Sequence, residues 1–146
     1  MPRPALTLAG NDLKLTSPAA SITLLDREVA DPDRPLVGPI WTVVSVISGD
    51  AVSSVMEGVV ATITFQADGQ VGFNTGCNAG GGRFSATADA LRFSELVMTE
   101  MACPGPAGEM EAAFLRVLSA ETVSYRIEAA SLELMVGASG LQLVGR

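Results

Sequence analysis

The 146 residues of this sequence include no histidine. Histidine is the side chain whose ordinary pKa lies nearest to neutral pH, and its imidazole is a frequent metal ligand. Its absence argues against most acid–base catalysis near neutral pH and against most metal sites. Only two cysteines are present, whereas a structural metal ion needs three or four ligands. We therefore expect no enzymatic activity, no metal and no cofactor.

Positive charge is also scarce, because nine basic residues face sixteen acidic ones and leave a net charge of −7. Nucleic acids and anionic membrane surfaces are bound by basic patches, so we expect neither as a partner. No stretch approaches the roughly 18 consecutive apolar residues of a membrane-spanning helix. The N-terminus lacks the apolar core and the cleavage site of a signal peptide. Either the protein is cytoplasmic, or a leader lies outside this sequence.

Apolar residues are plentiful, at 48% of the chain, and the first 27 residues place them at every second position in three short runs. This alternation predicts a three-stranded meander of half-buried strands. The C-terminus repeats the pattern, and the two segments align without a gap at an offset of 119 residues. Leu6 aligns with Tyr125 at the start of this match, and Arg27 aligns with Arg146 at its end. We expect residues 1–27 to be the last three strands of a preceding copy of the same domain. The alternative is a chance alignment of two leucine-rich meanders.

Residues 28–39 carry several prolines and are expected to form a linker without a helix or a central strand. The main domain then covers residues 40–146. Its first strand runs from Ile40 to Ile47 and holds Trp41, the one tryptophan, which we interpret as a core anchor. Residues 48–58 are expected to form a polar loop, and further short strands are expected at 60–65, 70–74, 83–87 and 91–93.

One good helix is predicted between Pro104 and Glu121, because five apolar residues there follow the helical spacing of one face. These residues are Met110, Ala113, Phe114, Val117 and Leu118. The acids Glu95, Glu100, Glu109 and Glu111 are scattered and are expected to be exposed. The predicted fold is mainly β (α+β), an antiparallel curled sheet or partly open β-barrel with one helix packed against it.

Both cysteines lie between Gly69 and Cys103, a stretch that also holds Gly76-Cys77-Asn78, the glycines 80–82 and Thr99-Glu100-Met101-Ala102-Cys103. Gly76 is expected to adopt a positive φ, Asn78 to bond backbone groups of the turn, and Thr99 to tie the strand end to the loop. A glycine run without a lysine or a following helix is a weak phosphate-binding signal, so a structural role is favoured. The cysteines lack a nearby base and form either a disulfide or two buried thiols.

Trp41, Gly76-Cys77-Asn78 and the Thr-x-Met-Ala-Cys pattern resemble the META domain, the family of the bacterial heat-shock protein HslJ. The resemblance covers residues 40–146 and implies a small β-barrel-like sheet with a helix against it. The structural motif residues would be Trp41, Gly76, Cys77, Asn78, Thr99, Met101 and Cys103. Family members with both cysteines are largely envelope proteins, an oxidising setting that favours a Cys77–Cys103 disulfide.

The same resemblance implies a periplasmic or extracellular protein, with a leader or lipid anchor outside this sequence and a cytoplasmic location as the alternative. We expect a non-enzymatic, stress- or surface-linked module that binds another protein or a cell-envelope component. The alternative is a small barrel that holds an apolar ligand. For residues 1–27 we expect strand addition to an edge of the main domain, with a strand-exchanged homodimer as the alternative.

Overall fold

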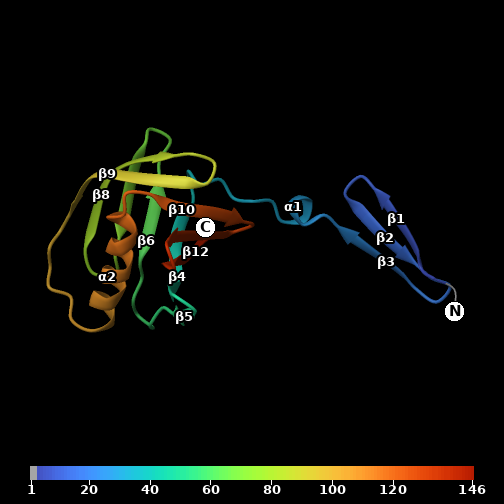
Figure 1. Cartoon of the computed structure of the whole chain (residues 1–146), viewed down its shortest axis with the longest axis horizontal. Helices are drawn as coiled ribbons and strands as arrows, with labels where there is room; N and C mark the ends of the chain where they lie inside the picture. The colour runs from blue at the N-terminus through green and yellow to red at the C-terminus, as the bar shows by residue number, and fades with distance from the viewer. Residues whose placement is uncertain (1–2) are drawn as a thin grey trace. The chain divides into compact units, whose positions relative to one another are not determined.

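The computed structural model describes residues 3–146, which fall into two compact units that meet between Asp33 and Arg34. The first unit contains the predicted meander, whose first two residues lie outside the described range. Its strands β1 (Ala5–Ala9), β2 (Asp12–Thr16) and β3 (Ser21–Leu25) form an antiparallel sheet of their own (Figure 1). In the described part of the chain these strands pair with one another, and their addition to an edge of the main domain stays a prediction.

A single helical turn, α1 (Arg27–Ala30), follows the meander, in the segment where no helix was expected. The prolines of this segment begin only at Pro32, so they leave the preceding residues free to turn. Asp26 caps the turn, because its carboxylate accepts the backbone N–H of Glu28 at 2.8 Å. Arg27 forms an ion pair with Asp33 at 3.2 Å.

The second unit is a closed antiparallel barrel, which confirms the predicted fold class. The sheet order is β12-β11-β10-β9-β8-β7-β6-β4, and β12 pairs with β4 along seven residues to close the ring. A ninth strand, β5, adds to β4 at the edge. The strands are β4 (Ile40–Ser48), β5 (Ala51–Ser54), β6 (Thr62–Phe65), β7 (Gln70–Asn74), β8 (Ala79–Ala86), β9 (Ala90–Met98), β10 (Val123–Glu128), β11 (Ser131–Val136) and β12 (Ser139–Gly145).

The predicted helix, α2 (Pro106–Leu118), connects β9 to β10, two strands that pair over only two residues. Four residues of the predicted stripe are buried, and α2 packs against β11 and β12. These four are Met110, Phe114, Val117 and Leu118, whereas Ala113 is partly buried. Neither α1 nor α2, the helices of the described chain, has the length and hydropathy needed to cross a membrane.

Large side chains fill the interior of the barrel, as expected for eight strands. Trp41 has no exposed surface, and its indole N–H donates to the carbonyl of Leu36 at 2.9 Å. Val37 forms a bridge with Phe65, so residues of the expected linker already belong to the main unit. Other interior residues exposed by 1% or less include Ala61, Ile63, Phe65, Leu91, Val123, Leu132, Leu134, Leu141 and Leu143.

Two local predictions were wrong. Within the expected loop 48–58, β5 forms a strand, although all four of its residues are exposed. The strand expected at 83–87 begins earlier, because the glycines 80–82 lie inside strand β8. A side chain on Gly81 would bring its Cβ to 2.9 Å from the carbonyl oxygen of Val71, because the neighbouring strand approaches closely.

Candidate functional site

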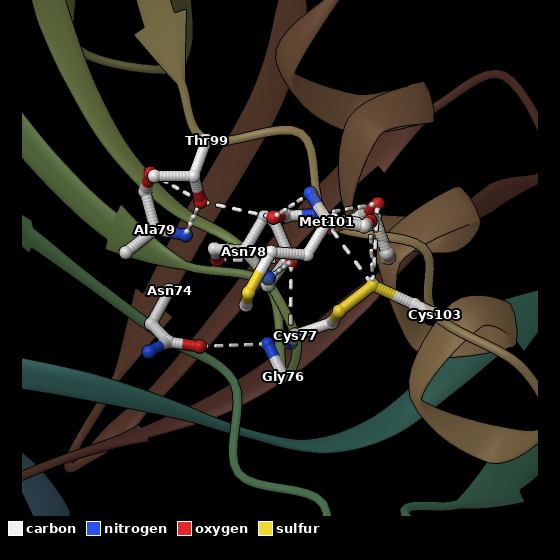
Figure 2. The surroundings of a disulfide bond; sticks show 10 residues. Asn74, Gly76, Cys77, Asn78, Ala79, Thr99, Met101 and Cys103 are labelled. Carbon is white, nitrogen blue, oxygen red and sulfur yellow. Dashed lines mark hydrogen bonds between the residues drawn. A yellow bond between two sulfur atoms is a disulfide. The ribbon is translucent and has the colours of Figure 1, made fainter.

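Two segments that are distant in sequence meet at a disulfide beside the barrel. Residues 75–78 connect β7 to β8, and residues 99–103 follow β9 (Figure 2). Cys77 and Cys103 are bonded to each other, with Cα atoms 6.1 Å apart. Gly76 has the expected positive φ, +96°, and a Cβ there would lie 2.9 Å from a methyl group of Val59. The turn at Gly76 therefore requires glycine for both its conformation and its space.

Asn78 is 1% exposed and uses its whole amide group to join the two segments. Its Oδ1 accepts the backbone N–H of Met101 at 2.7 Å and the hydroxyl of Thr99 at 2.9 Å. Its Nδ2 donates to the Met101 carbonyl at 3.1 Å and to Glu111 Oε2 at 2.9 Å. These partners lie in the segment 99–103 and on α2, beyond the turn that contains Asn78.

Glu111, which the sequence placed among exposed acids, is half-buried and faces Asn78 from α2. The hydroxyl of Thr75 donates to Glu111 Oε2 at 2.6 Å, and Thr75 has no exposed surface. Hydrogen bonds from Thr75 and Asn78 hold the pKa of the Glu111 carboxyl below its ordinary value, against the opposing effect of burial. Since Glu111 lies three residues before Phe114, its helical spacing beside the apolar stripe could have indicated that its side chain is partly buried, but not what it faces.

Most of the predicted motif residues share this cluster, but they contribute in different ways. Thr99 links the strand end to the loop, because its hydroxyl also accepts the backbone N–H of Ala79 at 3.2 Å. Met101 contributes its backbone groups, while its side chain is 60% exposed. Trp41 is not part of this cluster. Its ring packs against Gly145, where an added Cβ would lie 2.8 Å from the nearest ring carbon.

The cluster resembles a metal site in its donor atoms, since Cys77, Cys103 and Glu111 place one ligand atom each within 4.8 Å of one another. Cysteine binds metals as a thiolate, however, and the disulfide takes up both sulfur atoms. The Glu111 oxygens are engaged by Thr75 and Asn78, and the lowered pKa makes this carboxylate a weak base. The arrangement is therefore suited to bracing α2 and the two loops.

The family model of the META domain matches residues 34–144 of this chain. The chain belongs to the META domain family. The match begins where the main unit begins, six residues before the predicted start at residue 40. Among curated proteins, none matches the chain.

Two solved structures share the fold of this META domain. An NMR structure of a protein from Burkholderia xenovorans has a TM-score of 0.61 and 23% sequence identity, and the alignment covers 76% of this chain and 83% of that one. A second NMR structure has a TM-score of 0.57 and 18% sequence identity, and the alignment covers 73% of this chain and 87% of that one. At these identities the likeness shows the fold alone.

We predict that the disulfide stabilises the META domain by about 3 kcal/mol, the chain-entropy value for a loop of this length. The two cysteines are 26 residues apart in sequence. A variant with Cys77→Ser and Cys103→Ser should therefore unfold at lower urea than the oxidised wild type, and at similar urea to the reduced wild type. Thiol titration of the unfolded, unreduced protein should find no reactive thiol. Two reactive thiols per chain would contradict the bond.

Proposed function

We propose that this META-domain protein is a non-enzymatic module of the bacterial cell envelope, stress- or surface-linked, that binds another protein or an envelope component. The observation that carries the proposal is the Cys77–Cys103 disulfide at the centre of the hydrogen-bonded cluster. Disulfides form and persist mainly in oxidising compartments, among them the bacterial periplasm. A periplasmic or extracellular location is therefore favoured over the cytoplasm.

A binding role is supported over catalysis by the state of the polar groups in the cluster. General acid–base catalysis needs a group whose pKa lies near the working pH. The pKa of Glu111 is lowered, and the cysteines are bonded to each other, so neither supplies a base or a thiolate. The first unit instead exposes large apolar side chains, with Leu6 66% and Leu8 73% accessible. Such faces are typical of interaction surfaces.

The alternative, an apolar ligand inside the barrel, has less support, because large side chains fill the interior. An apolar cleft does lie between β5 and the first turns of α2, with Val55, Met56 and Met110 in its lining. Its volume of about 280 Å³ falls just below the range of about 300–1,000 Å³ that is typical of ligand pockets.

The location is tested by trapping the cysteines in living cells with a thiol-reactive reagent that adds mass, followed by separation of periplasm and cytoplasm. The full gene product should be found in the envelope fraction with both cysteines protected until a reductant is added. A matched variant, Ser119→Cys, gives the protein one exposed thiol directly after α2 and should be labelled without reductant. Recovery of the wild type in the cytoplasm with two labelled thiols would overturn the proposal.

A further inference from the structure

The sheet of β1–β3 repeats the last three strands of the barrel residue for residue. When 119 is added to each residue number, all five pairs between β1 and β2 become pairs between β10 and β11. The five pairs between β2 and β3 likewise become pairs between β11 and β12. For example, the pair Leu15–Ile22 corresponds to Leu134–Leu141. The two meanders therefore have the same register, and side chains at equivalent positions lie on the same face of each sheet.

The corresponding faces differ sharply in burial. In the barrel, Leu132, Leu134, Leu141 and Leu143 are each exposed by 1% or less. On the equivalent face of the first unit, Ile22 is 55% exposed and Leu24 48%. This apolar face consists of Leu6, Leu8, Leu13, Leu15, Ile22 and Leu24. The opposite face carries Thr7, Lys14 and Thr23, so the sheet is amphipathic and its apolar side is open to a partner.

The barrel itself shows what covers such a face. There, β12 pairs with β4, β10 pairs with β9, and α2 packs over β11 and β12. The complement of this meander is therefore the rest of a META barrel, from β4 to β9 with α2. A second copy of this chain does not offer that complement, because its own β10–β12 already occupy the place.

We propose that β1–β3 supply the last three strands to a META-type segment that ends after its helix and lacks strands of its own equivalent to β10–β12. This inference rests on the proposed binding role and names the partner. β3 would pair with the partner's first strand and β1 with the strand before its helix, as β12 and β10 do in the barrel. The apolar face of the meander would then become the wall of a second core.

The experiment attaches such a segment to the intact chain. Residue 1 corresponds to residue 120 at the observed offset, so residues 34–119 placed directly before Met1 restore the natural spacing. We expect this tandem protein to be a monomer with two complete barrels. Its second copy of Trp41 should be as shielded from a soluble quencher as the first, and both copies should give dispersed amide signals in NMR spectra.

Two matched substitutions test whether the attached segment folds on the apolar face of β1–β3 or folds independently of it. Leu13→Asp places a carboxylate on the apolar face, whereas Lys14→Glu changes charge on the opposite face. In the tandem with Leu13→Asp, about half of the tryptophan fluorescence should become quenchable and the attached segment should lose its dispersed signals. The tandem with Lys14→Glu should behave as the unsubstituted one.

Three results would overturn the proposal. The attached segment could stay unfolded in the unsubstituted tandem, or the second barrel could survive Leu13→Asp. Alternatively, the intact 146-residue chain could form a dimer that Leu13→Asp dissociates. The last result would assign the face to a second copy of the chain. Each of these outcomes leaves the envelope location untouched, because that location is decided by cysteine trapping alone.

Discussion

The Phe114→Ala variant is expected to unfold with a free energy about 3–5 kcal/mol below that of the wild type. Phe114 is 1% exposed at the centre of the buried face of α2, and its ring centroid lies 6.0 Å from that of Phe73 on β7. Truncation removes this buried area and leaves a cavity between helix and barrel. Since small domains have a total stability of roughly 5–15 kcal/mol, the loss is a large share of the whole.

Urea denaturation followed by tryptophan fluorescence measures this effect, because Trp41 is fully buried in the same core. The matched control is Arg116→Ala, an exposed position two residues further along α2. Alanine is a good helix former, so the control should change the free energy of unfolding by less than about 0.5 kcal/mol. Equal midpoints for the two variants would mean that α2 does not pack through Phe114.

The sequence was sufficient for those elements in which apolar and polar residues alternate clearly. Leucines at every second position predicted β1–β3 and β10–β12, because one face of each strand is apolar. The helical spacing from Met110 to Leu118 predicted α2 for the same reason. This signal vanishes where a residue carries no side chain, and it is also lost in a segment as short and polar as the Ala-Val-Ser-Ser of β5. The glycines of β8 and the exposed strand β5 were missed on that account.

The candidate site was predicted only in part, because its contacts are long-range. The motif pointed to Cys77, Asn78 and Cys103, but no local pattern shows that a helix residue 33 positions after Asn78 faces its amide. Glu111 was therefore placed with the exposed acids. Register between distant strands decides which loops meet, and it is set by the closed barrel as a whole.

Replacing Asn78 by aspartate should lower the free energy of unfolding by at least about 3 kcal/mol at pH 7, the scale for an uncompensated buried charge. The new side chain keeps the acceptor for the Met101 N–H but loses the amide donor to Glu111. It also places a second carboxylate where the amide nitrogen now lies 2.9 Å from Glu111 Oε2. Two carboxylates this close cannot both ionise without strong repulsion, so the pKa of one rises.

The pH dependence of the variant should be opposite in sign to that of the wild type. In the wild type the pKa of Glu111 is lowered, so its stabilisation is present above the ordinary carboxyl pKa and is lost as pH falls through the folded-state value. In the variant the pair of carboxylates has a raised folded-state pKa. Its penalty should therefore be relieved as pH falls from 7 to 5, and the stabilities of the two proteins should converge on acidification.

Urea midpoints at pH 5 and pH 7 measure this convergence, and Asn74→Asp is the matched control. Asn74 is exposed, and its Oδ1 accepts the backbone N–H of Gly76 at 2.8 Å, a role that aspartate keeps. Since a solvated charge there faces no carboxylate across a hydrogen bond, the control should stay within about 0.5 kcal/mol of the wild type at both pH values. If the two variants lost the same stability at pH 7, the amide donor of Asn78 would not be what joins α2 to the disulfide loops.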